Sequence, residues 1–155
     1  MIERPQTVGS FEYNAPELFT EAPADHSPAD YYDGSKADVF SAGVTLFLML
    51  TRSPPFRGAQ TKDPYYRRLC AHDKKAYWKI FGSLELSDEA KDLFEKMAER
   101  EPTARLSVSQ VLEHPWVKAE MLDGEQVLAE LGRRSEALQG EAANARLSSE
   151  SSGDE

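Results

Sequence analysis

The sequence predicts an all-α fold for most of its 155 residues, and three observations support this prediction. Residues 36–51 form one long apolar run, and residues 87–98 repeat apolar side chains at the spacing of a helix. No segment alternates polar and apolar residues for long enough to indicate a sheet. The length allows one domain and little more.

The composition indicates an ordinary globular chain, with 40% hydrophobic and 29% charged residues. Cys70 is the only cysteine, which excludes a disulfide framework or a cysteine-based zinc site within one chain. The opening MIERPQTVGS lacks the basic start and apolar run of a signal peptide. We therefore expect an intracellular protein, cytoplasmic or nuclear, in a reducing compartment.

The net charge of −9, from 27 acidic and 18 basic residues, argues against nucleic acid or an anionic membrane as a general partner. The charge is unevenly distributed. Residues 119–155 carry nine acidic and three basic side chains, whereas residues 1–118 carry 18 and 15. We therefore expect two regions, a folded body over 1–118 and an acidic tail over 119–155.

Within the body, residues 20–35 form a polar stretch rich in Pro, Asp, Ser and Gly, which predicts a surface loop. The helix predicted over 36–51 has apolar side chains on all sides, which predicts burial on every side. It is too short and too often interrupted by polar residues to span a bilayer. The following RSPP ends it, because proline cannot continue a helix.

Helical segments continue to the end of the body. Residues 63–82 predict two short helical turns with aromatic anchors. Ser87 is predicted to cap the amphipathic helix over 87–98, and Ser107 with Gln110 predicts a capping box for another short helix. Pro115 is expected to close that helix.

The tail keeps a thin apolar stripe over 119–143, formed by Val127, Leu128, Leu131 and Leu138. This pattern predicts a weak helix, and the polar, acidic last dozen residues are expected to be disordered. Two interpretations remain: a regulatory helix that folds back on the body, or a solvated extension, which we favour. The acidic charge makes calmodulin an improbable ligand.

Five short motifs, taken in order over residues 7–118, resemble the C-terminal lobe of a eukaryotic serine/threonine protein kinase. A looser similarity points to the calcium/calmodulin-dependent group. The motifs are Ala15-Pro16-Glu17, the DVFSAG of residues 38–43, Pro54-Pro55-Phe56, the EPTAR turn ending at Arg105, and His114-Pro115-Trp116.

The resemblance implies structural roles for residues far apart in the sequence. Glu17 is expected to pair with Arg105, because a buried carboxylate needs a bidentate partner. Asp38 is expected to be a buried acceptor for the backbone of the catalytic loop, and Gly43 and Trp116 belong to the scaffold. Without that loop, Asp38 would leave a costly unpaired acceptor, and the lobe would be poorly stable by itself.

The same resemblance implies a substrate-binding segment before the A-P-E motif, lined by Thr7, Gly9, Ser10, Phe11 and Asn14. In the serine/threonine class, the hydroxyl corresponding to Ser10 reaches back toward the catalytic aspartate. Tyrosine kinases usually carry a proline-bearing loop here, so the sequence favours serine/threonine specificity.

The motifs that perform phosphoryl transfer are missing from this sequence: it contains no G-x-G-x-x-G, H-R-D or D-F-G. No catalytic residue and no metal ligand is predicted, since His26, His72 and His114 lack companions at helical spacing. ATP and Mg²⁺ are cofactors of the complete family domain, and we expect none in this chain.

Two functions remain open. The first is the C-terminal, substrate-binding part of a serine/threonine kinase, active only with the upstream half. The alternative is a non-catalytic kinase-like binding module. Either function predicts a protein partner, as substrate or as cover for the exposed face of the lobe, with no role for nucleic acid or membrane.

Overall fold

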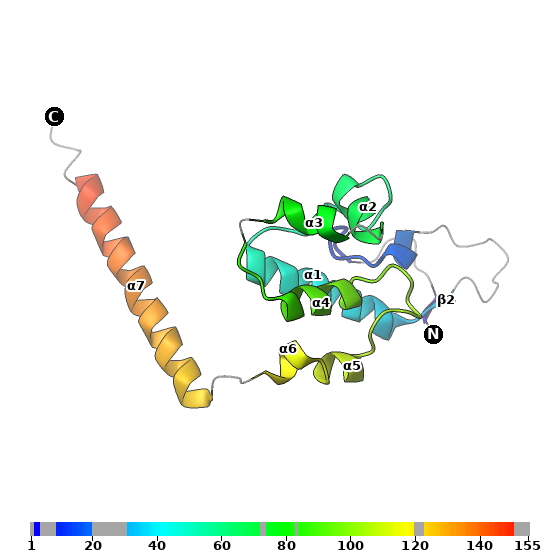
Figure 1. Cartoon of the computed structure of the whole chain (residues 1–155). Coiled ribbons are helices and arrows are strands. Elements are labelled where there is room, and N and C mark those ends of the chain that lie inside the picture. Colours follow the sequence, from blue (N-terminus) through cyan, green and yellow to red (C-terminus); the bar gives the residue numbers. More distant parts are fainter. Residues whose placement is uncertain are drawn as a thin grey trace. The chain divides into compact units, whose positions relative to one another are not determined.

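A computed structural model shows two compact units, Met1–Lys118 and Ala119–Glu155 (Figure 1). The structure describes residues 2–3, 9–19, 31–71, 74–82, 84–119 and 123–150, with only the backbone for 2, 3, 31 and 141–150.

Helix α1 (Gly34–Thr51) is the long central helix of the first unit (Figure 1). The Asp33 carboxylate caps its start by accepting from the backbone N–H of Ser35 at 3.0 Å and of Lys36 at 3.4 Å. Arg52 ends it in the left-handed conformation, with φ at 58°, and its N–H donates to the Leu48 carbonyl. The predicted helix is confirmed, and it begins two residues earlier than expected.

One face of α1 is exposed to solvent, so the prediction of burial on every side is wrong for that face. Asp38, Ala42, Thr45 and Met49 are exposed at intervals of three and four residues, and Met49 is 70% exposed. The opposite side is buried, including Phe40, Val44 and Phe47. Apolar composition showed that the helix suits an interior, but it did not show which neighbours cover it.

Helices α2 (Pro64–Cys70) and α3 (Lys74–Ile80) confirm the two predicted helical turns. Tyr77 and Trp78 of α3 join an aromatic core in which the rings of Phe47 and Phe94 lie 4.7 Å apart. Burial raises the pKa of Tyr77, so its hydroxyl stays protonated and donates to the Pro55 carbonyl at 3.3 Å.

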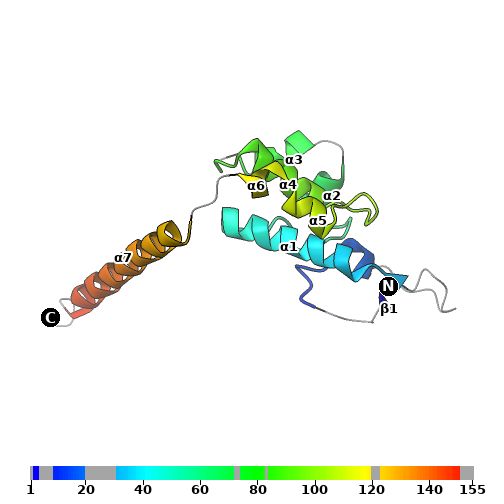
Figure 2. The ribbon, with the colours of Figure 1, turned by 90° about the horizontal axis from the view of Figure 1, so that it is seen from below.

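Helix α4 (Asp88–Met97) is the predicted amphipathic helix, and it packs along α1 (Figure 2). The Ser87 hydroxyl accepts from the Ala90 N–H at 3.1 Å, which confirms the predicted cap. A Cβ atom placed on Gly43 of α1 would lie 2.9 Å from the Cβ of Met97. Gly43 therefore lets the two helices approach closely.

Two short helices end the unit, α5 (Val108–Leu112) and α6 (Pro115–Lys118). The predicted capping box between Ser107 and Gln110 is confirmed. Pro115 was expected to close α5, but it begins α6 instead. The first turn of a helix accepts proline, because the N–H that it lacks has no intrahelical partner there.

A two-residue antiparallel pair joins β1 (Ile2–Glu3) to β2 (Tyr31–Tyr32), with Ile2 opposite Tyr32. Residues 31–32 belong to the segment predicted to be a loop. Strands of two residues are too short to produce an alternating pattern, so no sequence pattern indicated this pairing. The rest of the predicted loop, residues 20–30, lies outside the described residues.

Helix α7 (Gly124–Glu150) forms the described part of the second unit. Asp123 and Gln126 cap its start reciprocally, at 2.8 and 3.0 Å. Its side chains over 124–140 are exposed, except for the half-buried Glu130. The helix runs past residue 143, where disorder was expected, and this stretch contains Ala145, Arg146 and Leu147, which have high helix propensity. Residues 151–155 lie outside the described part.

Candidate functional site

A buried arginine, Arg105, lies in the turn between α4 and α5 and has a fully buried side chain. Its Nη1 and Nη2 donate to the two carboxylate oxygens of Glu17, at 2.7 and 2.9 Å. The Glu17 side chain is 8% exposed, and it belongs to the short 3₁₀ helix η1 (Pro16–Phe19). The structure therefore brings the two residues of the expected pair together in a bidentate, buried arrangement.

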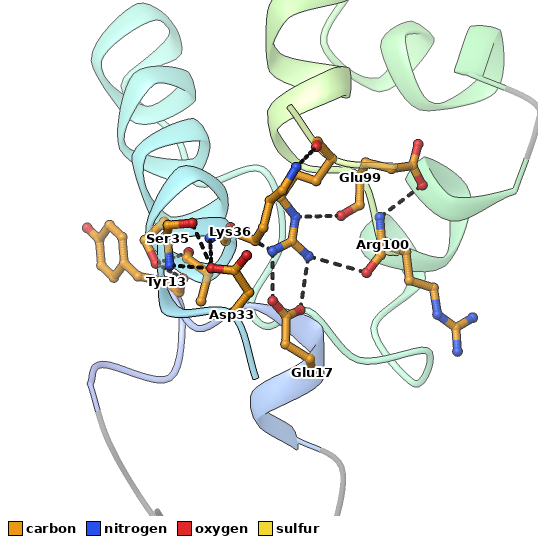
Figure 3. Close-up of polar contacts among 10 residues, drawn as sticks. Tyr13, Glu17, Asp33, Ser35, Lys36, Glu99 and Arg100 are labelled. Carbon is orange, nitrogen blue, oxygen red and sulfur yellow. Dashed lines mark hydrogen bonds and ion pairs between the residues drawn. The ribbon is translucent and has the colours of Figure 1, made fainter. Parts of the chain in front are cut away.

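The remaining N–H groups of Arg105 bind backbone carbonyls from two other segments (Figure 3). Nη1 also donates to the Lys36 carbonyl of α1 at 2.7 Å. The carbonyls of Glu99 and Arg100 accept from Nε and Nη2 at 2.9 and 3.3 Å. Each of the five guanidinium N–H donors thus has an acceptor, so the desolvated charge is fully hydrogen-bonded.

We call Arg105, with Glu17 and the three backbone carbonyls that it binds, the anchor. Two further contacts strengthen it. The guanidinium carbon of Arg105 lies 5.0 Å from the centre of the Phe40 ring, a cation–π distance. The Lys36 ammonium donates to the Arg105 carbonyl. This role of Lys36 was not predicted, because a lysine early in a helix carries no distinguishing signal. The anchor therefore joins η1, the start of α1 and the turn between α4 and α5.

The anchor immediately follows the candidate substrate segment, residues 9–14. Gly9 has a φ of +79°, in the left-handed region that favours glycine. A Cβ atom at Gly9 would lie 2.6 Å from Oδ1 of Asn14, so a side chain here would collide with Asn14. Ser10 is exposed, and its carbonyl accepts from the Tyr13 N–H at 2.9 Å, closing a turn.

Phe11 is 46% exposed at the outer edge of this turn. Its ring lies 5.0 Å from that of Phe19, and it also packs against Gly58, where a Cβ atom would be 2.3 Å from the Phe11 ring. Gly58 is a contact that sequence analysis missed, because it lies almost fifty residues away in an unremarkable loop. Thr7, the remaining predicted member of the segment, lies outside the described residues.

Ser41 of α1 holds the backbone of the candidate substrate segment at Tyr13. Its hydroxyl lies within hydrogen-bond distance of the Tyr13 carbonyl at 2.9 Å and of the Ala37 carbonyl at 3.2 Å. Sequence analysis gave Ser41 no role. The available signal was a serine inside a helix, where its propensity is modest and a specific bond is a common reason for its presence.

The other predicted scaffold residues occupy different environments. Gly43 is buried against Met97, and Trp116 packs partly buried on the cluster of Val39, Leu93 and Met97. Asp38 is exposed, so the expected buried acceptor without donors is wrong. Because its carboxylate is accessible to solvent, the expected instability loses this cause.

His114 of the H-P-W motif has a structural environment. It is buried, and its Nε2 lies 2.9 Å from Oδ2 of Asp92. Its Nδ1 accepts from the backbone N–H of Trp116 at 3.3 Å. Partial burial raises the pKa of Asp92, but the hydrogen bonds from Lys96 and His114 outweigh it and hold that pKa below its ordinary value. This contact ties α6 to α4.

An open cavity of about 460 Å³ borders the anchor. Its volume falls in the range of small-molecule sites. Polar and apolar side chains line it together: Pro16, Glu17, Phe19, Ala59, Gln60, Thr61, Tyr66, Arg100, Glu101 and Pro102.

The residues present do not fit a nucleotide–magnesium site. Across the residues that the structure describes, no group of three or more His, Cys, Asp or Glu side chains is arranged to hold a metal ion. The sequence contains none of the three motifs that bind the triphosphate, the metal and the acceptor hydroxyl.

Among the described helices, none has the length and apolarity needed to cross a membrane.

Comparison with known proteins identifies the part of the chain that carries these features. A family described as "Protein kinase domain" matches residues 3–117. Calcium-dependent protein kinase 22 of Oryza sativa subsp. japonica is 36% identical over 115 residues, covering 73% of this chain. The MAP kinase-interacting serine/threonine-protein kinase 1 of Xenopus tropicalis is 35% identical over 130 residues, covering 72% of this chain.

The matched region is a small part of each relative. It spans 17% of the rice protein, 29% of the Xenopus protein, and 19% of calcium-dependent protein kinase 25 of Arabidopsis thaliana, which is 36% identical over 121 residues. The chain therefore spans less than a third of the length of these curated relatives.

Proposed function

The chain belongs to the protein kinase family, and from this premise we propose that its Met1–Lys118 unit is the substrate-binding part of a serine/threonine kinase. The observation that carries the proposal is the buried fork between Arg105 and Glu17. This fork holds η1 in place directly after residues 9–14, so a segment that is largely exposed is also firmly anchored. Such a segment can hold a peptide in a defined position.

In this proposal each residue of the segment has a role. Gly9 and Asn14 shape the turn, Ser10 presents its hydroxyl beside the acceptor residue of the substrate, and Phe11 contacts the residue that follows it. Thr7 belongs to the same pocket by resemblance. The turn and the bond from Ser41 support this assignment, because they keep the backbone of 10–13 in one conformation.

The proposed reaction is transfer of the terminal phosphoryl group of ATP to a serine or threonine hydroxyl, giving a phosphate ester and ADP. It requires the metal and nucleotide ligands of the complete family domain, which residues 1–155 do not contain. The residues of this chain bind and orient the protein substrate. We therefore expect no transfer by the 155-residue chain alone.

A chimera tests this proposal. Residues 9–118 would replace the matching region of the rice calcium-dependent kinase, and phosphate transfer to serine, threonine and tyrosine peptides would be measured. We expect transfer to serine and threonine only. Ser10→Ala is expected to lower kcat by about two orders of magnitude, at the lower end of the range for loss of one group that assists proton transfer.

Ser109→Ala, at an exposed position of α5, is the matched control and is expected to leave kcat unchanged. A folded chimera that binds ATP but phosphorylates no peptide would contradict the proposal. Turnover by the 155-residue chain with ATP, Mg²⁺ and peptide would contradict its dependence on the missing motifs.

One observation favours the alternative, a non-catalytic binding module. Asp38 and Ala42 of α1 are exposed, and the described core packs around Phe40, Phe47 and Phe94. Sequencing the transcript upstream of residue 1 discriminates the two functions. An in-frame D-F-G shortly before residue 1 favours the kinase, whereas a stop codon favours the module.

A further inference from the structure

Positive charge is concentrated in one part of this acidic chain. Residues 57–79 contain seven basic and two acidic side chains, a net charge of +5. The remaining residues contain 11 basic and 25 acidic side chains, a net charge of −14. The segment therefore differs in sign from the rest of the molecule.

The structure places these basic residues on neighbouring elements. They lie on the loop before α2, on α2 itself and on α3, and the two helices contact each other (Figures 1 and 2). All seven side chains are exposed to solvent. We call this set the α2–α3 basic surface; its members are Arg57, Lys62, Arg67, Arg68, Lys74, Lys75 and Lys79.

Carboxylates of α4 lie near one end of this surface, since Asp88, Asp92 and Glu95 line one hollow with Lys74 and Lys75, but few pair with its basic side chains. Asp63 is buried, and its carboxylate accepts from the backbone N–H groups of Arg57, Tyr65 and Tyr66, so it serves the helix cap. Lys74 pairs with Glu95. Within the described part of the chain, the other six basic side chains form no ion pair, and Asp73 lies outside it.

Local stability accounts for only part of this arrangement. Arg67 and Arg68 lie in the last turn of α2, and Lys79 in the last turn of α3, where the helix dipole favours a cation. Arg67 and Arg68 are nevertheless adjacent like charges, and Lys75 lies in the first turn of α3, where the dipole disfavours a cation. Unpaired like charges on one surface repel one another and weaken the fold slightly. A ligand of opposite charge would relieve this repulsion.

We propose that the α2–α3 basic surface binds a carboxylate-rich segment of a partner protein. Paired arginines recognise carboxylates through bidentate hydrogen bonds, and the partly exposed Tyr65 adds a flat apolar contact beside them. Helix α2 is about 10 Å long, the span of about three extended residues. The surface therefore suits a short acidic segment.

The charge of the remaining chain decides between classes of partner. Nucleic acid and anionic membranes are extended polyanions, and the net charge of −14 elsewhere would repel them. A short peptide contacts only the basic surface. The surface shares no residue with residues 9–14, although Arg57 precedes Gly58, which contacts Phe11. This inference does not depend on the proposed role of that segment.

The test uses the full 155-residue chain and a fluorescent decapeptide that alternates glutamate and glycine. Fluorescence anisotropy at low salt measures its affinity, and the same peptide with glutamine in place of glutamate is the ligand control. We expect binding of the glutamate peptide only, with an affinity that falls as salt is added. Equal binding of both peptides would overturn the proposal.

The decisive variant is R67E/R68E, and the chain provides a matched control, R133E/R134E, in the exposed adjacent arginines of α7. Both variants change the net charge equally. We expect the first to weaken peptide binding at least about tenfold, and the second by less than about twofold. Equal weakening by both would show a general charge effect and overturn the proposal.

Two additional measurements keep the test decisive. If circular dichroism shows that R67E/R68E is unfolded, the variant K75E/K79E replaces it with the same expected result. A serine-phosphorylated peptide, a DNA duplex or a phosphatidylserine vesicle that binds this surface more tightly than the glutamate peptide would overturn the choice of ligand. Ser10→Ala is expected to leave this binding unchanged, whether or not the proposed function is correct.

Discussion

Helices α4 and α7 are both rich in charged residues, but they are stabilised in different ways. Helix α4 has ten residues, of which Ala90, Leu93, Phe94 and Met97 are buried against α1 and the aromatic core. Helix α7 has 27 residues, and none of its described side chains over 124–140 is buried. The shorter helix is stabilised by tertiary packing, and the longer one by its own sequence.

The two helices therefore depend on different interactions. Packing determines whether α4 forms, so its stability is that of the whole unit. Helix propensity, the Asp123–Gln126 cap and the ion pairs of Glu130 with Arg133 and Arg134 support α7. A substitution in the first unit should therefore act globally, and one in α7 locally.

The largest contrast is expected between two arginines. Arg105→Ala removes the fork and leaves the Glu17 carboxylate buried, which should lower the free energy of unfolding of the first unit by about 3–5 kcal/mol. Arg133→Ala should change it by less than about 0.5 kcal/mol, because its ion pair is exposed. Both tryptophans lie in the first unit, so tryptophan fluorescence in urea measures its unfolding.

The double variant Glu17→Met/Arg105→Met provides the control for this pair. It removes both charges, so it should be less destabilised than Arg105→Ala. Similar urea midpoints for Arg105→Ala and Arg133→Ala would refute the distinction between the two regions.

Two glycines should respond with opposite signs. Gly43→Ala places a methyl group 2.9 Å from the Cβ of Met97, which should destabilise the first unit by about 1–3 kcal/mol. Gly132→Ala in α7 meets no atom within 4 Å and should favour the local helix by about 1 kcal/mol. Urea unfolding measures the first effect, and carbon-13 chemical shifts along α7 measure the second. A stabilised Gly43→Ala protein would show that α1 and α4 pack less closely than described.

The two helix caps offer a smaller contrast. Ser87→Ala removes the acceptor for the Ala90 N–H and should cost the first unit about 1 kcal/mol. Asp123→Ala should reduce helicity in the first turn of α7 while leaving the urea midpoint of the first unit unchanged. If both variants lowered that midpoint equally, the stability of α7 would be coupled to that of the first unit.

The smallest effect concerns pH. Hydrogen bonds from Arg133 and Arg134 lower the pKa of Glu130 to about 2 from the ordinary value of 4.5. A lowered pKa means that this contribution is complete above pH 4.5 and is lost as the pH falls through about 2. We expect the chemical shifts of residues 130–134 to lose helical character over that interval. Glu130→Gln should abolish the transition, and a transition centred near 4.5 would contradict the ion pairs.

Much of the fold was predictable because its signals are local. The caps at Ser87 and Ser107, the amphipathic pattern of α4 and the two aromatic helices follow from neighbouring residues. The exposed face of α1 and the two-residue strand pair were not predictable. The first depends on which neighbours surround the helix, and the second joins segments almost thirty residues apart with too few residues to form a pattern.

The candidate site was predictable only where a family motif fixes the residue. Motif order indicated the pairing of Glu17 with Arg105, although 88 positions separate them. The same motifs predicted that Asp38 would be buried, because the catalytic loop covers the matching residue in the complete family domain. This sequence has no catalytic-loop motif, and Asp38 is exposed. Ser41, Lys36 and Gly58 were missed, because their contacts arise from packing geometry.

The position of Arg105 has a consequence for local fluctuations. The Arg105 guanidinium hydrogen-bonds to three separate segments. If any of them detached, the buried guanidinium would lose acceptors for its N–H groups. The amides of η1, of the first turn of α1 and of residues 99–106 should therefore exchange their hydrogens at a shared, slow rate. The short, surface-lying η1 would then open only when the core of the unit opens.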